Sequence, residues 1–423
     1  MSTAAASLLL AGCGGAHAVA GGGSTLPPTQ PSASSAPAPT QSPARSPAPR
    51  CGASTAALRG DSVELTGVQF VSGSTGWAVG SDRILGTDDG GRHWVTEYRS
   101  PAAAQLATVD FTDARHGWVT GASTILATAD GGAHWQVLPE PCPVLRTVHF
   151  ISSAVGFAVA GGSLAGGSLP FPGVPAADGV LLATTDGGLR WHRLAAPASV
   201  QSECFDSPEQ GWLGAGGRIY GTVDGGRSWT LAVQGARYRP GPPGVAVLAE
   251  VECAGNGAAW AELIGPGAAM NHVPHIGYHT FGTTWQPIFA EQYTGHPGVR
   301  VQAASPGPEP GPFSAVSPSV AVFIDSCAPC EQPGTPPPGS TVQGSAPLDL
   351  ALNGGAILRS RGPVSGLAVA DAAAFVSPDE GWVVGTQTTY PASGSTAGIR
   401  TLSRIMQTAD GGRTWQVQYT LAQ

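Results

Sequence analysis

Lysine is absent from this sequence, since all 20 of its basic residues are arginine, and charged residues make up only 11% of its 423 residues. Its 28 acidic residues leave a formal net charge of −8 at pH 7. A nucleic-acid-binding surface needs clustered positive charge. The composition therefore argues against nucleic acid as a partner.

Sequence motifs that carry common chemistry are also missing. The chain has no phosphate-cradling loop, no His-Glu-x-x-His helix and no Gly-x-Ser-x-Gly elbow. No stretch reaches the ~18 apolar residues that a transmembrane helix requires. We therefore expect no cofactor and no membrane-spanning helix.

Residues 1–12 read as a targeting segment. A short apolar run from Ala4 ends in Leu-Ala-Gly directly before Cys13. This resembles the bacterial lipoprotein signal, in which the cysteine is lipidated and becomes the mature N-terminus. The resemblance implies a signal peptide over 1–12, lipidation of Cys13, and a location at the extracytoplasmic face of the bacterial cell membrane, held there by the lipid alone. The first three residues lack the positive charge that a signal peptide normally has, so we expect the true start codon upstream of Met1.

Glycine and proline are abundant, at 61 and 38 residues. Together with Ser, Thr and Ala they fill residues 13–55, a segment that cannot bury enough apolar surface to offset its ordering entropy. We predict a disordered tether there, extended at up to ~3.1 Å per residue. Residues 56–423 are predicted to form the folded domain.

A repeat fills that domain. Its second element, Thr-x-Asp-Gly-Gly-x-x-Trp, occurs intact five times, with Asp89, Asp130, Asp186, Asp224 and Asp410 as its acidic residue and Trp94, Trp135, Trp191, Trp229 and Trp415 at its end. Two altered copies end at Trp285 and Leu358. A first element precedes every copy and is marked by Trp77, Trp118, Phe157, Trp212, Trp260, Val322 or Trp382. The chain therefore holds seven units.

Each unit contains four short strands. In the first unit we expect them at 67–71, 77–80, 84–87 and 93–98, with a tight turn at 89–91. Glycine supplies the positive φ of such a turn, and the Asp carboxylate can accept backbone N–H bonds across it. Seven units predict a single all-β, seven-bladed β-propeller, with a six-bladed ring as the alternative. The blades are expected near 66–100, 107–140, 146–195, 201–235, 248–290, 312–362 and 369–421.

These elements resemble the Asp-box, or BNR-like, repeat of β-propeller proteins. That family includes sialidases, xyloglucan-cleaving hydrolases, sortilin-type receptors and the photosystem II assembly and stability factor. The resemblance covers residues 62–421. It implies that the Asp and Trp residues of the box are structural, so it says little about function.

Four units are longer than the others between their second and third strands, at about 159–180, 263–276, 326–348 and 386–402. In a propeller these loops emerge on the same face as the connections between blades, whereas the Asp-box turns lie on the opposite face. Long loops on a rigid scaffold commonly carry function. We expect the face with the insertions to bind the partner, with functionless drift of Gly/Pro-rich loops as the alternative.

Six cysteines remain besides Cys13, namely Cys51, Cys142, Cys204, Cys253, Cys327 and Cys330. An even number in an exported protein indicates disulfides, although it leaves many pairings open. Cys204 and Cys253 occupy neighbouring positions in adjacent units, which favours a bond between them. Cys327 and Cys330 can close a small loop. Redox chemistry at that pair is the alternative, but no helix follows that would lower a thiol pKa.

Three histidines are the candidates for a metal site. His272, His275 and His279 are three and four residues apart, and imidazoles at such spacing can share a metal. Pro274 and the strand geometry are expected to point the rings apart, and no carboxylate lies near them in sequence. We therefore predict that no metal binds.

Polar residues on the innermost strands are the candidates for a channel site. The position eight residues before each first-element marker is occupied by Gln69, Asp110, His149, Cys204, Glu252, Ser314 and Ala374. Glu203 joins this set where other units carry valine. The carboxylates of Glu203 and Glu252 can in principle flank a glycosidic bond. The alternative is that such groups hold channel waters, and we predict no catalytic residue here.

The sequence lacks the residues that the enzymes of this family need. Sialidases need an early Arg-Ile-Pro, and the nearest match is Arg218-Ile219-Tyr220. Xyloglucanases use two propellers, and this chain has room for one. All 11 Trp fall in the repeat, which leaves none for a sugar-stacking platform. We expect a monomeric, non-catalytic scaffold or assembly protein that binds an envelope protein or a cell-wall polymer. The alternative is a glycan-binding protein or a sialidase-like glycoside hydrolase.

Overall fold

The computed structural model of the protein describes residues 64–100, 105–121, 124–161, 179–234, 248–265, 275–291, 310–325, 339, 341–342, 347–389, 391 and 400–422. These residues lie in one compact unit, Pro49–Gln423. The predicted signal peptide, the lipidation site at Cys13 and the tether up to residue 55 lie outside the described residues. Within the described ranges no helix is long and apolar enough to cross a bilayer.

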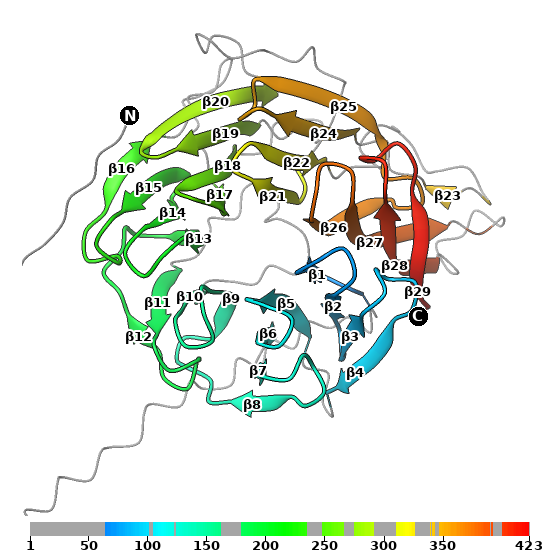
Figure 1. Ribbon diagram of the computed structural model, residues 1–423, viewed down its shortest axis with the longest axis horizontal. Helices are drawn as coiled ribbons and strands as arrows, with labels where there is room; N and C mark the ends of the chain where they lie inside the picture. Colours follow the sequence, from blue (N-terminus) through cyan, green and yellow to red (C-terminus); the bar gives the residue numbers. More distant parts are fainter. Residues whose placement is uncertain are drawn as a thin grey trace, which may run out of the picture. The chain divides into compact units, whose positions relative to one another are not determined.

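Seven antiparallel sheets form a ring of blades (Figure 1), and each blade uses strands that are consecutive in the sequence. The six-bladed alternative is therefore wrong. The first four blades contain β1 (Gly67–Phe70), β2 (Gly76–Gly80), β3 (Arg83–Thr87) and β4 (Val95–Arg99); β5 (Leu106–Phe111), β6 (Gly117–Gly121), β7 (Thr124–Thr128) and β8 (Gln136–Leu138); β9 (Leu145–Phe150), β10 (Gly156–Ala160), β11 (Val180–Thr184) and β12 (His192–Arg193); and β13 (Val200–Phe205), β14 (Gly211–Ala215), β15 (Arg218–Thr222) and β16 (Thr230–Val233).

The fifth and seventh blades have the longest strands. The last three blades contain β17 (Leu248–Gly255), β18 (Ala258–Ile264), β19 (His275–Phe281) and β20 (Thr284–Glu291); β21 (Phe313–Ser317), β22 (Val320–Ile324), β24 (Pro347–Leu352) and β25 (Ile357–Pro363); and β26 (Val369–Phe375), β27 (Gly381–Thr389), β28 (Arg400–Thr408) and β29 (Gln416–Ala422). A short strand, β23 (Thr341–Val342), arises from the insertion of the sixth blade and pairs with β27 of the seventh.

The hairpin β27–β28 corrects one expectation about the insertions. Its ladder continues from Gly381 and Thr408 to Thr389 and Arg400. Residues 386–389 and 400–402, the two ends of the segment 386–402 that the repeat spacing predicts to be a loop, are therefore an extension of the seventh blade. All four insertions do lie between the second and third strands of their blades, as predicted.

The Asp-box turn has the same hydrogen bonds in every intact copy. In the first blade the Thr87 hydroxyl donates to Asp89 Oδ1 at 3.0 Å and accepts from the Gly91 N–H at 3.0 Å, while Asp89 Oδ1 also accepts from the His93 N–H at 2.9 Å. Gly90 and Gly91 have φ of 77° and 88°, a region that favours glycine. The carboxylate therefore holds the turn closed, as the sequence predicts.

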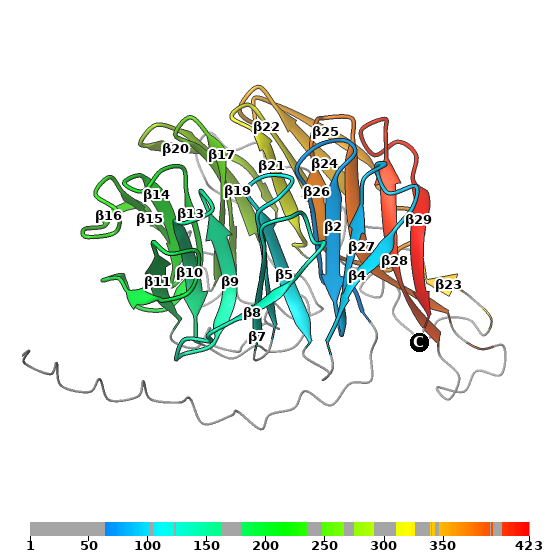
Figure 2. The same ribbon diagram turned by 60° about the horizontal axis from the view of Figure 1, so that its bottom comes forward.

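The Asp-box turns lie beside the turns between first and second strands. In the first blade the Gly90 N–H donates to the Ser74 carbonyl at 2.8 Å. An equivalent bond occurs in all seven blades, including the two with altered boxes, where it joins Gly282 to Gly257 and Gly354 to Ser319. These turns make up one side of the ring, the Asp-box face, at the top of Figure 2. Because strands alternate in direction, the loops between second and third strands emerge on the opposite side, the insertion-bearing face.

The apolar core lies between the blades, where aromatic rings stack. Phe111 of β5 stacks on Trp77 of β2 with ring centroids 3.4 Å apart and planes 5° from parallel. The first and seventh blades meet in the same way, through Phe70 and Trp382 at 3.5 Å and 6°. Because the sheets of the first and seventh blades share no strand, the ring closes between them by side-chain packing and not by exchange of a strand.

A glycine makes room for each of these phenylalanines. Gly76 pairs directly with Phe70 in the ladder, and a Cβ on Gly76 would lie 2.5 Å from the ring. The same holds for the corresponding glycines of the second, third, fourth and seventh blades, Gly117, Gly156, Gly211 and Gly381. Packing thus explains the Gly-Trp dipeptide of the repeat. The Trp packs against the next blade, and the Gly leaves room for the Phe of its own blade.

Candidate functional site: the central channel

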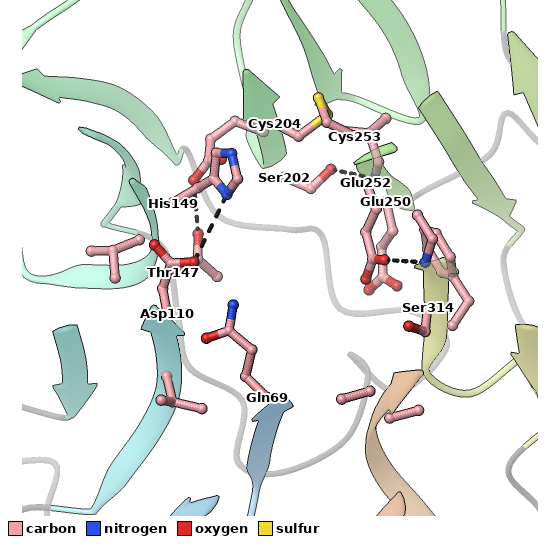
Figure 3. Close-up of a pocket in the computed structure, with 18 of the residues that line it drawn as sticks. Gln69, Asp110, Thr147, His149, Ser202, Cys204, Glu250, Glu252, Cys253 and Ser314 are labelled. Carbon is pink, nitrogen blue, oxygen red and sulfur yellow. Dashed lines mark hydrogen bonds and ion pairs between the residues drawn. A yellow bond between two sulfur atoms is a disulfide. The ribbon is translucent and has the colours of Figure 1, made fainter. Parts of the chain in front are cut away.

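The innermost strands of the blades surround a cavity of about 800 Å³. Its polar lining comes mainly from the second to fifth blades and includes Asp110, Arg146, His149, Glu203, Glu250 and Glu252. In Figure 3, Glu250 and Glu252 lie on one side of the opening, across from Asp110, Thr147 and His149. The sequence-predicted channel residues Asp110, His149, Glu203 and Glu252 are therefore brought together around one space.

The predicted channel position is the one eight residues before each first-element marker. Most residues at this position form a hydrogen bond with the backbone of the next blade. They do so through five hydrogen bonds: Gln69 Oε1 from Phe111 N at 2.5 Å, Asp110 Oδ2 from Phe150 N at 2.5 Å, His149 Nε2 to Phe205 O at 3.1 Å, Glu252 Oε2 from Ala315 N at 2.7 Å, and Ser314 Oγ from Phe375 N at 3.1 Å. These side chains tie neighbouring blades together. The polar character of this position therefore has a structural explanation.

A disulfide takes the place of such a bond between the fourth and fifth blades. Cys204 of β13 is bonded to Cys253 of β17, with their Cα atoms 5.5 Å apart, as their neighbouring positions predict. Cys142 is also disulfide-bonded. Cys51, Cys327 and Cys330 lie outside the described residues, so the small loop expected at 327–330 stays a prediction.

Asp110, His149 and Glu203 form one electrostatic cluster across the second, third and fourth blades. Burial raises the pKa of Asp110, and it raises the pKa of Glu203 to about 7. Burial alone would lower the pKa of His149, but the charges of Asp110 and Glu203 raise it instead. His149 Nδ1 lies 4.0 Å from Asp110 Oδ1. An imidazolium in this position offsets part of the negative charge that the two carboxylates bring into the channel.

Glu250 and Glu252 lie on β17 two residues apart, so both side chains are on the same face of that strand. Burial raises the pKa of each to about 7, and the neighbouring Glu250 adds to the shift of Glu252. Both residues also line a second hollow of about 460 Å³ that continues the channel. They therefore occupy the boundary between the two spaces.

The candidate metal ligands do not converge. The His279 Nε2 donates to the Pro318 carbonyl at 2.8 Å and the ring packs against Trp260. His275 is buried, with its Nε2 3.6 Å from Glu262 Oε1 and 3.8 Å from Asp325 Oδ1. His272 lies outside the described residues. Among the residues that the structure describes, no group of three or more His, Cys, Asp or Glu side chains is arranged to hold a metal ion.

Arg146, Thr147 and Glu250 are channel residues that the sequence analysis missed. Glu250 could have been found, because it precedes Glu252 by two residues and strands alternate in the direction of their side chains. Arg146 and Thr147 lie near the start of β9, three and two residues before His149. The same alternation could have found Thr147, whereas nothing in the repeat marks Arg146. Only the ring arrangement brings them opposite the fifth blade.

Comparison with known proteins confirms the resemblance that the repeat indicates. The sequence model of the family described as "Photosynthesis system II assembly factor YCF48" matches residues 95–262, from β4 to β18. No curated protein sequence matches the chain.

Solved structures with the same architecture are similar only at low identity. A structure titled "YCF48 bound to D1 peptide" is 15% identical, covering 76% of this chain and 90% of that one, with a TM-score of 0.48. A GH74 enzyme of Niastella koreensis is 12% identical over 84% of this chain, with a TM-score of 0.52, and the chain spans 66% of the enzyme's length. A GH74 xyloglucanase of Xanthomonas campestris is 10% identical, covering 84% and 67%, with a TM-score of 0.49. The shared feature is the propeller fold.

Proposed function

We propose that the protein is a non-catalytic β-propeller that binds an envelope protein or a cell-wall polymer through its insertion-bearing face and acts as a scaffold or assembly module. The observation that carries this proposal is that the residues of the repeat motif make contacts that hold the fold together. The box aspartates close turns, and Glu252, one of the two candidate catalytic carboxylates, accepts a backbone hydrogen bond from the next blade. The match to an assembly-factor family supports the same reading.

The proposed location is the extracytoplasmic face of a bacterial membrane, with the chain anchored through a lipid on Cys13. Two observations support it. The sequence Leu-Ala-Gly-Cys at 10–13 is typical of a lipoprotein signal. The disulfide between Cys204 and Cys253 is a feature of proteins that fold in an oxidising compartment.

Site-specific photocrosslinking tests which face binds. We would place a photoreactive residue at Arg400, which is exposed at the start of β28 on the insertion-bearing face, and at Asp88, which is exposed in the Asp-box turn of the first blade. In intact cells the proposal predicts a defined crosslinked species from position 400 and none from position 88. Crosslinks from position 88 alone would overturn the choice of face.

A second candidate function is glycoside hydrolysis. One observation favours it: Glu203 is buried and its pKa is raised to about 7, which is the environment of a general acid. Incubation of the folded protein with cell-wall, sialylated and β-glucan oligosaccharides separates the two functions. Cleavage that is lost in Glu203→Gln would establish the hydrolase, whereas a protein that leaves all three classes uncleaved fits the scaffold.

A further inference from the structure

The channel holds two opposite charges that do not meet. Arg146 of β9 and Glu250 of β17 line the same cavity and attract one another. Neither side chain has a hydrogen bond or an ion pair within 4 Å with any residue that the structure describes, and Arg146 Nε is buried without a hydrogen-bond partner. Opposite charges in a low-dielectric space normally close into a contact pair. Here a gap separates them, and a molecule with both charges fits such a gap.

Glu203 adds a buried group with unused bonding capacity. It is 7% exposed and lines the cavity. Its Oε1 accepts from the Thr147 hydroxyl at 3.3 Å and the Val159 N–H helps to lower its pKa, but its buried Oε2 has no hydrogen-bond partner within 3.5 Å among the described residues. A buried carboxylate oxygen without a donor is costly, and a bound donor would remove that cost.

The charge of the channel is unbalanced toward the acidic side. Four carboxylates line the cavity, those of Asp110, Glu203, Glu250 and Glu252, against the guanidinium of Arg146 and the imidazole of His149. His149 is engaged with Asp110 and Glu203 and also acts on Glu252, whereas Arg146 acts on Glu250. A ligand that matches this site carries one negative group and more than one positive group.

We propose that the channel is a binding site for a small zwitterion of the basic amino-acid class. Arg146 binds its carboxylate, and Glu250 and Glu252 bind its positively charged groups, with Glu203 as a further acceptor. The cavity of about 800 Å³ is within the range of small-molecule sites, roughly 300–1,000 Å³. This proposal does not rest on the proposed binding of a partner through the insertion-bearing face.

The strand directions place the open pair near one mouth of the channel. Innermost strands run from the insertion-bearing face toward the Asp-box face, and Arg146 precedes His149 on β9 as Glu250 precedes Glu252 on β17. Arg146 and Glu250 therefore lie closer to the insertion-bearing face, where the second hollow continues the channel. A ligand enters from that side.

Isothermal titration calorimetry on the full chain tests the site with three probes. L-arginine carries the carboxylate and both cationic groups, agmatine lacks the carboxylate, and L-citrulline lacks the charged guanidinium. We expect L-arginine to bind and each analogue to bind at least about tenfold more weakly, because each loses a charge-assisted contact. Absence of L-arginine binding at millimolar concentration, or equal binding of all three probes, overturns the proposal.

Variants assign the contacts. Arg146→Gln is expected to weaken L-arginine about tenfold or more while leaving agmatine unchanged, because only the carboxylate contact is lost. Glu250→Gln is expected to weaken both probes. Glu209→Gln, at an exposed position on the Asp-box face, is the matched control and should change neither. If Glu250→Gln binds L-arginine as the wild type does, with the same melting temperature, the site is not where we place it.

Discussion

Five blades of this propeller keep the repeat and two depart from it, and the departures occur in pairs. In the regular first blade a phenylalanine, Phe70, lies over Gly76. In the fifth blade the two paired positions are Cys253 and Ala259, and in the sixth they are Ala315 and Ala321. Where the large ring is lost, the glycine that makes room for it is lost too. The motif therefore records a packing constraint between two residues rather than a site.

The turns of the two altered blades show the same compensation. In a regular box the Thr hydroxyl accepts the bond from the second glycine. The sixth blade has Ala351 at the Thr position, and there the Gly355 N–H bonds to the Leu352 carbonyl at 3.1 Å instead. In the fifth blade the ladder continues to Phe281 and Thr284, which leaves a two-residue turn. The glycine N–H of each altered turn therefore has a backbone acceptor, Gly257 for Gly282 and Leu352 for Gly355.

The largest effect is expected when the phenylalanine side chain is removed from a regular blade. Phe70→Ala should lower the free energy of unfolding by about 3–5 kcal/mol, because it leaves a cavity beside Trp382 at the ring-closing interface. Ala315→Gly, at the equivalent position of the sixth blade, should cost roughly 0.5–1 kcal/mol, since only a methyl group is lost. Chemical denaturation measures both, and equal costs would contradict the comparison.

The same pair of positions should be energetically coupled. Gly76→Ala alone is expected to cost about 1–3 kcal/mol, because its Cβ would meet the Phe70 ring. In the Phe70→Ala background the same substitution should cost less than about 0.5 kcal/mol, since it recreates the Ala–Ala pair of the sixth blade. Additive effects in this double-mutant cycle would show that the two positions vary independently.

Loss of the disulfide should come next. Replacing Cys204 and Cys253 together by serine is expected to cost about 2–4 kcal/mol, because the bond closes a long loop between the fourth and fifth blades. The corresponding hydrogen bond between the fifth and sixth blades, removed in Glu252→Ala, should cost about 1–3 kcal/mol. Thermal melts of both variants under oxidising conditions compare the two losses of stability. A smaller loss for the double serine variant than for Glu252→Ala would contradict the expected order.

The channel carboxylates should make stability depend on pH. Burial raises the pKa of Glu203 to about 7 in the folded protein, above the ordinary glutamate value of 4.5. Between these pH values the folded state holds a proton that the unfolded state has released, so the unfolding free energy falls as pH rises from about 4.5 to about 7. Glu203→Gln cannot titrate and should flatten this fall by on the order of 2 kcal/mol. An unchanged slope in the variant would contradict the assignment.

The smallest effect is expected in the turns. Thr87→Val removes the acceptor of the buried Gly91 N–H and should cost about 1–2 kcal/mol. Ala351→Thr in the sixth blade should change stability by no more than about 0.5 kcal/mol, because Gly355 already has its acceptor. Urea titrations of the two variants compare the blades, and a clear gain from the added threonine would show that the sixth turn is not compensated.

Sequence alone predicts the parts of this molecule that local positions determine. The blade count, the box turns and the Cys204–Cys253 bond follow from residues at fixed places in the repeat. The length of the β27–β28 hairpin does not, because its extension to Thr389 and Arg400 depends on pairing outside the motif. The facing positions of Arg146 and Glu250 do not follow either, since the two residues line one cavity only when the ring is closed.

The central claim is that the residues of the repeat build the propeller, whereas the channel side chains that lie outside the repeat motif bind a ligand. Unfolding and L-arginine binding, measured side by side on Phe70→Ala/Gly76→Ala and on Glu250→Gln, test it most directly. The account predicts that the first variant is less stable than the wild type but binds equally well, and that the second is as stable but binds about tenfold more weakly. Affinity and stability falling together in both variants would contradict it.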